Sequence, residues 1–369
     1  MIILATAIIL SLSNSGIIGK ANKAKTDSDI ANLKEYVNTL RAEWELMTAE
    51  EQAATASSFE AYANKKIEDN GYKGAVGVDG EVYSNLNDNA RAAIVAGIKV
   101  GDAVTGYTVE AKTYETSGEE NTAPNNIETN LTPQTIVTNT QITWKYLGVN
   151  TDGKIEMVAD FGAAVAEDDS KIKLSGKGGY LKGPQMLNLV CKVLYSVEEM
   201  GQARSMNIDD VNNILGYTGE RGAYWNTSRN YVITQGIMTV GELETLFGKK
   251  LSNRTRLEEK DISSYYSDYY KIDKVGDINE MKKTENIEVV YNTSNKYWLA
   301  SSCTFVRFNN SAISFCVRYV NTNLVNAQNV FDSDDESHCF TFAIRPVVRL
   351  EPSVTLTKDT TAENTWKIN

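Results

Sequence analysis

The only histidine of the chain stands beside one of its four cysteines. His338 directly precedes Cys339, and a cysteine paired with a histidine can act as an activated nucleophile. Adjacent residues of a strand point to opposite faces, however, and we recognise neither an orienting third group nor an oxyanion site. We therefore predict that the protein is not an enzyme and has no catalytic residue.

A short acidic run precedes this pair. Asp332, Asp334, Asp335 and Glu336 supply the carboxylate oxygens that Ca²⁺ prefers. An EF-hand loop requires glycine at its sixth position, where Ser337 stands here. We expect a solvated acidic loop without a metal ion, and we expect no cofactor elsewhere. A Ca²⁺ site at this run is the alternative.

The remaining residues that could carry chemistry lack the spacing of a known site. The four cysteines, Cys191, Cys303, Cys316 and Cys339, form no CxxC pair, which argues against a zinc ribbon or a thioredoxin-type site. Disulfide bonds and buried thiols both fit cysteines that are so widely spaced. The glycine-rich run at 176–179 lacks the GxxxxGK[ST] pattern of a phosphate-binding loop.

The composition of the C-terminal part indicates recognition. No Lys occurs between Lys296 and Lys358, and Asn, Ser, Asp, Phe, Val and Cys fill much of the interval. Strand-forming residues that carry short polar groups offer hydrogen bonds and aromatic area at a low cost in side-chain entropy. Two motifs frame this segment, Tyr297-Trp298-Leu299-Ala300-Ser301 and Arg345-Pro346-Val347-Val348. We expect Arg345 to form a buried framework salt bridge.

The bulk composition restricts the partners. The 369 residues are enough for one large or two ordinary domains, and 42% of them are hydrophobic. The net charge is −11, and the isoelectric point is about 4.9. Binding to a nucleic-acid backbone needs clustered Lys and Arg, so we expect no nucleic-acid partner.

The N-terminal segment combines an apolar run with a helical pattern. Residues 1–10 are apolar and uncharged, and with residues 11–13 they fall short of the roughly 20 residues that span a bilayer as a helix. The run also lacks the charged start and the cleavage site of an ordinary signal peptide. Apolar residues then recur at helical a and d positions, at Ile30, Leu33, Val37, Leu40, Trp44 and Met47. We predict that residues 1–47 form one continuous helix that projects as a stem; a buried core helix is the alternative.

This segment resembles the N-terminal helix of type IV pilin-like proteins of Gram-positive bacteria. In that family a phrase such as Asn14-Ser15-Gly16-Ile17-Ile18-Gly19-Lys20-Ala21 follows the membrane-spanning half. The sequence departs from the family in having no leader, no processing site and no acidic fifth residue, so we expect the true start to lie upstream of Met1. The resemblance implies an extracellular protein at the cell surface, anchored in the membrane or assembled into a pilus through this helix.

The rest of the chain divides into three further segments. Residues 48–94 hold a second helix, which starts at the capping-box pair Thr48 and Glu51, and connecting loops. Residues 95–352 form a strand-rich domain, and residues 353–369 form a tail. Within the domain we predict a hairpin with its turn at 150–153, and helices at about 185–196 and 207–216.

The order of these elements resembles the C-type-lectin-like fold, in the branch shared with formylglycine-generating enzymes. The resemblance rests on the Trp144 hairpin, the two helices and the two framing motifs. It implies an α+β protein in which a long N-terminal helical stem precedes a lectin-like domain of two helices packed on short, mostly antiparallel strands. Trp144, Trp298 and the strand at 346–348 would share one core. We find no cysteine or copper motif of the enzymes to carry over.

Within that branch the sequence is similar to surface proteins of gut Firmicutes whose last segment is the variable region of a diversity-generating retroelement. The family implies that template adenines are copied with errors, mostly at AAY codons, which cannot yield Lys, Glu, Gln, Met or Trp. Between Ser302 and Ala343 the chain has no Lys, Met or Trp, one Gln and one Glu. We therefore expect a variable region at 302–343; a strand-rich segment that avoids Lys by chance is the alternative.

The implied function is that of an adhesin or receptor whose hypervariable face binds a protein or glycan on another cell, a phage or a host surface. A structural minor pilin or pseudopilin without a diversified site is the alternative. Strict alternation along 315–320 would place Tyr319 with Phe315, whereas the family pattern leaves Tyr319 variable; we follow the family and expect exposed Tyr319 and Phe305 as aromatic anchors. The predicted ligand-binding residues are Phe305, Arg307, Asn309, Asn310, Tyr319, Asn321, Asn323, Asn326, Asn329, Asp332, Asp334 and His338.

Overall fold

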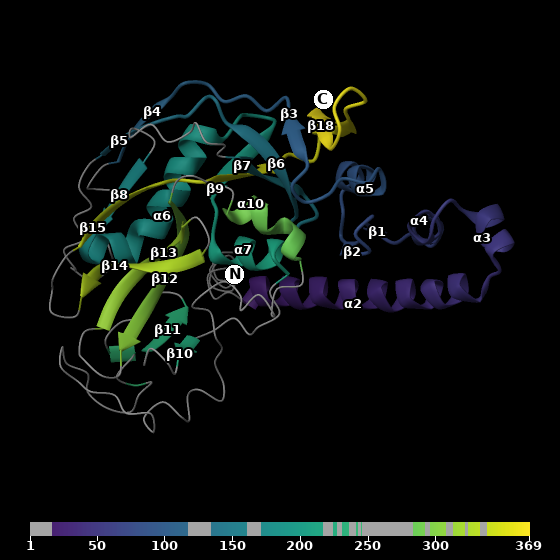
Figure 1. The fold of residues 1–369 in the computed structure, drawn as a ribbon, viewed down its shortest axis with the longest axis horizontal. Coiled ribbons are helices and arrows are strands. Elements are labelled where there is room, and N and C mark those ends of the chain that lie inside the picture. The colour runs from purple at the N-terminus through teal and green to yellow at the C-terminus, as the bar shows by residue number, and fades with distance from the viewer. Residues whose placement is uncertain are drawn as a thin grey trace, which may run out of the picture. The chain divides into compact units, whose positions relative to one another are not determined.

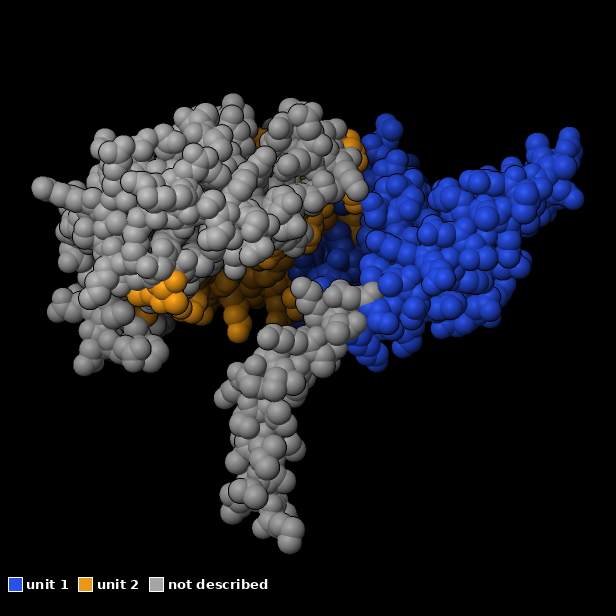
Figure 2. All heavy atoms as spheres, turned by 90° about the horizontal axis from the view of Figure 1, so that it is seen from below, with its two compact units in different colours: residues 1–102, 148–156, 350–369 blue, residues 103–147, 157–349 orange. Residues whose placement is uncertain are grey.

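The structure is a computed structural model with a mixed α/β fold (Figure 1). It describes residues 17–116, 134–160, 171–216, 224–226, 231–235, 241–242, 245, 283–291, 296–307, 313–321, 324–332 and 338–369. The chain divides into two compact units, each assembled from segments that are distant in the sequence (Figure 2). Unit 1 contains residues 1–102, 148–156 and 350–369, and unit 2 contains residues 103–147 and 157–349. These units do not coincide with the four segments predicted from the sequence.

Unit 1 is built mainly from helices and short hairpins. Its elements are α2 (Ile17–Leu46), α3 (Ala49–Thr55), α4 (Phe59–Asp69), β1 (Gly74–Val76), β2 (Val82–Ser84), α5 (Asp88–Val95), β17 (Leu356–Lys358) and β18 (Thr365–Ile368). Strands β1 and β2 pair as one antiparallel hairpin, and β17 and β18 pair as another. Asn64 of α4 joins the helix to β1, because its side-chain amide both donates to and accepts from the backbone of Val76, at 2.9 and 2.8 Å.

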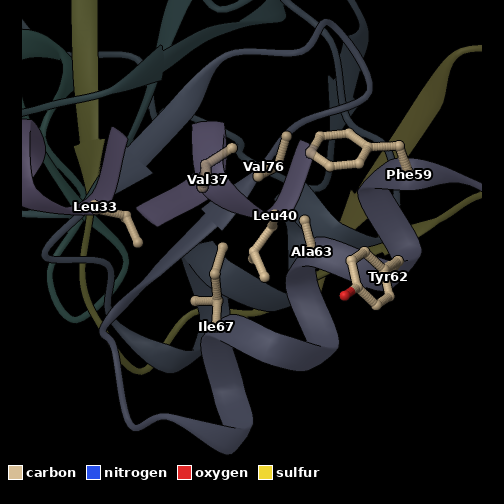
Figure 3. Close-up of a cluster of buried hydrophobic side chains, with 8 residues drawn as sticks. All are labelled: Leu33, Val37, Leu40, Phe59, Tyr62, Ala63, Ile67 and Val76. Atoms are coloured by element: carbon tan, nitrogen blue, oxygen red, sulfur yellow. The ribbon is translucent and has the colours of Figure 1, made fainter. Parts of the chain in front are cut away.

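The apolar seam of the first helix is buried inside unit 1. The side chains of Leu33, Val37 and Leu40 are buried, and Trp44 and Met47 pack against the same cluster. Figure 3 shows the side chains that meet there, which come from α2, α4 and β1: Leu33, Val37, Leu40, Phe59, Tyr62, Ala63, Ile67 and Val76. A seam that is covered by the chain's own elements needs no partner helix, because its apolar area is already removed from water.

The predicted fold class, α+β with a long helical stem before a lectin-like domain, is therefore wrong. The described helix α2 ends at Leu46, one residue before the predicted end at 47, but it is a packed element of unit 1 rather than a projecting stem. Residues 1–16, the apolar part of the predicted stem, lie outside the described residues. The described part of the chain contains seven α-helices and several sheets, and none of these helices is both long and apolar enough to cross a bilayer.

The second predicted helix is two helices in the structure. The capping box of Thr48 and Glu51 begins α3 as predicted, but α3 ends at Thr55. Ser58 then accepts a hydrogen bond from the Ala61 amide and caps a new helix, α4. Gly71 follows α4 with φ of 72°, a conformation that glycine adopts without steric cost.

Unit 2 holds most strands of two larger sheets and a short hairpin. In the first sheet, five neighbouring strands follow the order β3 (Ala103–Thr105), β6 (Thr143–Val149), β7 (Ile155–Asp160), β16 (Pro346–Leu350) and β9 (Gly201–Ser205). The second sheet has the order β10 (Tyr224–Asn226), β11 (Tyr231–Gln235), β12 (Tyr297–Arg307), β13 (Ile313–Asn321) and β14 (Leu324–Asp332). Strand β15 (Cys339–Ala343) pairs with β12 and with β8 (Lys171–Ser175), and β4 (Thr113–Thr116) pairs with β5 (Gln134–Val137).

The helices of unit 2 are α6 (Gly176–Tyr195), α7 (Ile208–Ile214) and α10 (Ile287–Tyr291). Both predicted helices are present, although α6 begins nine residues earlier than the predicted start at 185 (176 against 185). The glycine-rich run begins α6, and Gly179 and Gly183 allow it to lie against β8: an added Cβ would stand 3.3 and 3.1 Å from atoms of Leu174. Close packing thus accounts for the glycines at 179 and 183.

Trp144 and Trp298 are both buried within unit 2, in different sheets. The indole of Trp144 donates to the Tyr107 carbonyl oxygen at 3.2 Å, and that of Trp298 donates to the Ile172 carbonyl oxygen at 2.8 Å. Strand β16 lies in the sheet of Trp144.

The predicted turn at 150–153 is confirmed. Gly153 has φ of 73°, and its amide donates to the Asn150 carbonyl oxygen at 3.0 Å.

Candidate functional site

The predicted binding segment folds as the antiparallel strands β12, β13 and β14 (Figure 1). Phe305, Ser314 and Asp332 form one row across the three strands, near one end of the sheet. Asn321 pairs with Leu324 at the other end. The seven residue steps from Ser314 to Asn321 separate these ends by roughly 24 Å, at about 3.4 Å per residue. The predicted residues therefore do not form one compact patch.

The structure covers the predicted residues unequally. Asn309, Asn310, Asn323 and Asp334 lie outside the described residues. Backbone register alone is described for Phe305, Arg307, Asn326, Asn329 and Asp332. Asn321 and His338 are half-buried, and the His338 amide donates to the Val330 carbonyl oxygen at 3.0 Å.

The central strand of this region is buried on both faces. Every side chain from Phe315 to Val320 is buried, including both sets of the alternation. Helix α6 covers the face of Phe315, whose ring centroid lies 5.0 Å from that of Tyr180. Two hydrogen bonds attach β12 to the same helix: the Ser302 hydroxyl donates to the Tyr180 carbonyl oxygen at 2.7 Å, and the Tyr180 and Thr304 hydroxyls lie 2.8 Å apart. A strand covered in this way is a framework element.

The prediction that Tyr319 is an exposed anchor is wrong. Its side chain is 6% exposed, and its ring packs against Trp298 and Phe342, with centroids 6.4 and 4.9 Å apart. The Lys296 ammonium nitrogen lies 5.9 Å from the centre of the ring. Strict alternation grouped Tyr319 with Phe315 and Val317 without saying which set would be buried, and in the structure both sets are buried.

Arg318 is a buried guanidinium in the middle of this strand. Its side chain is 1% exposed, and none of its three guanidinium nitrogens has a hydrogen-bond partner in the described part of the chain. Burial of a charge is costly unless the charge is paired and hydrogen-bonded. Arg318 is therefore the residue of β13 whose burial costs the most free energy. Neither its type nor its spacing in the sequence indicated that it would be buried in this way.

Arg345 is buried as predicted, but its partners are not carboxylates. Its Nε donates to the Ala159 carbonyl oxygen at 3.0 Å, and its Nη1 donates to the Val290 carbonyl oxygen at 3.1 Å and to the Tyr297 hydroxyl at 2.9 Å. Its Nη2 donates to the carbonyl oxygen of Val289. Val289 and Val290 lie at the end of α10, where carbonyl groups are left without helical partners. The expected salt bridge is thus replaced, among the described residues, by a cap on that helix.

A second arginine, Arg204, holds the start of α7 through Asp210. The sequence contains the capping-box signal for this helix start. Arg204 binds Asp210 through two hydrogen bonds, of 2.6 and 2.7 Å. Asp210 also accepts from the Asn207 amide at 2.8 Å and completes a capping box with it. The spacing of Asn207 and Asp210 is the capping-box spacing, so this cap was open to prediction.

Burial shifts the pKa values of several titratable groups of unit 2. Burial raises the pKa of the Cys191 thiol far above its usual range, so the thiol stays protonated and weakly nucleophilic at neutral pH. Burial likewise raises the pKa values of Tyr107 and Tyr195. The Tyr107 hydroxyl donates to the Tyr195 carbonyl oxygen at 2.8 Å and accepts from the Val197 amide at 3.1 Å.

The structure describes the two possible chemical sites at 332–339 only in part. Cys339 is an exposed residue of β15. Among the described residues, no group of three or more His, Cys, Asp or Glu side chains is placed to hold a metal ion. Residues 333–337, which carry most of the acidic run, lie outside the description.

Comparisons with protein-family models, with curated proteins and with solved structures found no match for this chain.

Proposed function

We propose that the protein is an extracellular ligand-binding protein whose ligand contacts the ends of the β12–β14 sheet and the segments that connect its strands. The ligand class is a protein or glycan on another cell, a phage or a host surface. The observation that carries the proposal is the burial of β13 on both faces. Because the centre of the sheet is fixed by packing, its ends and connections are the parts left for recognition.

The residue types at those ends suit a polar ligand. The row of Phe305, Ser314 and Asp332, with Arg307 two residues beyond Phe305, offers aromatic, hydroxyl, carboxylate and guanidinium groups. The connection at 308–312 adds Asn309 and Asn310. Aromatic and arginine side chains commonly dominate the binding energy of an interface, and short polar groups adapt their hydrogen bonds to a given ligand.

The composition of residues 303–342 supports diversification of this region. The segment has no Lys, Met or Trp, and its polar residues include many that AAY codons reach. Substitutions at the ends of a sheet leave the packed centre intact, so such a region tolerates many sequences. The resemblance to surface proteins diversified by retroelements rests on the same residues.

Binding is tested with the full chain on two probes, a printed glycan array and a panel of intact bacterial cells and phage particles. The variant Asn309→Ala/Asn310→Ala/Asp334→Ala removes polar groups from two connecting segments. We expect the wild-type chain to bind at least one probe, and we expect this variant to bind it at least tenfold more weakly, as a hot-spot loss above about 1.4 kcal/mol requires.

The matched control is Asn32→Ala/Glu35→Ala/Asn38→Ala, which removes the same chemical groups from exposed positions of α2. It should retain binding, and both variants should keep the wild-type melting temperature. Binding of no probe, or equal binding by all three proteins, would overturn the proposal.

The genome neighbourhood tests diversification separately. A reverse-transcriptase gene near a second, similar copy of the coding segment for residues 302–343 is the expected arrangement. Prepilin-peptidase and assembly-ATPase genes without such a copy would contradict diversification and favour a structural minor pilin or pseudopilin.

A further inference from the structure

Two of the four cysteines stand directly opposite each other in the second sheet of unit 2. Cys303 of β12 and Cys316 of β13 are register partners, with Ser302 opposite Val317 and Thr304 opposite Phe315 on either side. Both cysteine side chains are buried. Directly opposite residues of antiparallel strands project from the same face, so the two sulfur atoms lie on the same side of the hairpin.

The spacing of opposite residues fits a disulfide bond. Their Cα atoms in an antiparallel pair are about 4.5–5.5 Å apart, and disulfides join Cα atoms about 4.4–6.8 Å apart. Their Cβ atoms are about 4.5–5.5 Å apart, against about 3.5–4.5 Å in a disulfide. Both cysteines carry a thiol in the structure, and a small approach of the two strands would bring their Cβ atoms into the disulfide range.

The other two cysteines lack such a partner. Cys191 is buried in α6, and Cys339 is paired in the sheet with Ser175 of β8. The described register thus singles out one bond among the six pairs that four cysteines can form.

We propose that Cys303 and Cys316 form a cross-strand disulfide when the protein folds in an oxidising compartment. A low-molecular-weight disulfide, RSSR, is the oxidant. One cysteine thiolate attacks it and releases RS⁻, and the second thiolate then displaces a second RS⁻ from the mixed disulfide. The two cysteines are oxidised to one disulfide, RSSR is reduced to two RSH, and the two cysteine protons pass to the released thiolates.

The burial of both residues determines the stage of folding at which the bond can form. The oxidant must reach the thiols before β12 and β13 are packed, so the bond forms during folding rather than afterwards. The bond would link the strands on both sides of the 308–312 connection. It does not depend on the proposed ligand site, because its basis is the register and burial of the two cysteines.

The test compares the full chain refolded with oxidised and reduced glutathione with the chain refolded in dithiothreitol. Each sample is denatured, alkylated with N-ethylmaleimide and weighed by mass spectrometry. We expect two labels after oxidative refolding, on Cys191 and Cys339, and four labels after refolding in dithiothreitol, since the chain has four cysteines. Trypsin cleaves after Lys296, Arg307 and Arg318, so the linked cysteines appear on two joined peptides, 297–307 and 308–318.

Two variants make the assignment specific. Cys316→Ser should abolish the joined peptides, whereas Cys339→Ser, at an exposed position, should leave them unchanged. Four labels after oxidative refolding would overturn the proposal, and so would a bond that includes Cys191 or Cys339. The wild-type measurement decides the question even where a variant fails to fold.

Discussion

Arg345 and Arg318 are both about 1% exposed, yet their surroundings differ completely. Arg345, just outside the predicted variable segment, donates to three backbone carbonyls and one hydroxyl. Arg318, inside that segment, has no hydrogen-bond partner among the described residues. A buried charge that makes several hydrogen bonds has much of its desolvation cost offset, whereas one without partners bears the full cost. The polar contacts of Arg345 therefore help to hold its surroundings, whereas the surroundings of Arg318 must be held mainly by apolar packing.

The packing around β13 meets that requirement. Trp298, Tyr319 and Phe342 form one aromatic group, and Tyr180 joins Phe315 to α6. Aromatic side chains bury large areas, and their pairs add about 0.5–1.5 kcal/mol beyond that burial. A sheet with such a centre can accept changes at its ends, which is the property that a diversified binding region requires.

The largest effect is expected at Arg345. Arg345→Met removes the donors from the Ala159, Val289 and Val290 carbonyl groups and leaves them buried. We expect a loss of about 3–5 kcal/mol in the free energy of unfolding, measured by urea denaturation. Arg345→Lys keeps the charge but not the forked geometry of the guanidinium. Its loss in the free energy of unfolding should therefore be measurable but smaller than that of Arg345→Met. A loss below about 1 kcal/mol for Arg345→Met would contradict the contrast drawn between Arg345 and Arg318, because the hydrogen bonds of Arg345 would then contribute little to stability.

Tyr319→Ala is expected to cost about 3 kcal/mol in the free energy of unfolding, because it removes a ring that packs on Trp298 and Phe342. The matched control is Tyr319→Phe, which keeps the ring and should stay within about 1 kcal/mol of wild type. If Tyr319→Ala leaves stability unchanged, β13 is not the apolar framework inferred from its burial.

The disulfide is expected to stabilise the same hairpin. The bond would close a loop that spans 13 residue steps from Cys303 to Cys316 (316 − 303), for which chain-entropy arguments give about 2–3 kcal/mol. Oxidised and reduced wild-type protein should differ in melting temperature by roughly 5–10 °C. Cys339→Ser should show the same difference between its two redox states. If oxidised and reduced wild-type protein have the same melting temperature, the disulfide does not stabilise the hairpin.

Arg318→Met is expected to have the smallest effect and the opposite sign to Arg345→Met. Replacing an unpaired buried cation by an apolar side chain of similar length should be neutral or should stabilise the protein by about 1 kcal/mol. Urea denaturation of the two methionine variants side by side measures the contrast directly. A loss as large as that of Arg345→Met would show that Arg318 has a partner beyond the described residues.

The local elements could largely be predicted from the sequence. The capping box of Thr48 and Glu51, the turn that ends at Gly153 and the helix that begins at Ile208 all lie where residue types placed them. Each depends on contacts between residues a few positions apart, so a short window contains all the atoms that decide it.

The candidate site could be predicted only in part. The strands of the segment and the alternation along β13 were visible in the sequence. Side-chain spacing cannot tell which face a helix will cover, and in β13 both faces are covered. The opposition of Cys303 and Cys316 was equally hidden, because it depends on the register between two strands.

The sequence by itself determined where α2 ends and which of its side chains form an apolar seam, because helical period and residue type are local properties. Tertiary structure alone decided what covers that seam: α4 and β1 of unit 1 instead of a partner helix. It also decided that Arg345 meets carbonyl oxygens brought from Ala159 and from the end of α10. The physical reason is the same in both cases. A residue's own chemistry sets what it must bury or bond, and the path of the distant chain sets which atoms are there to meet it.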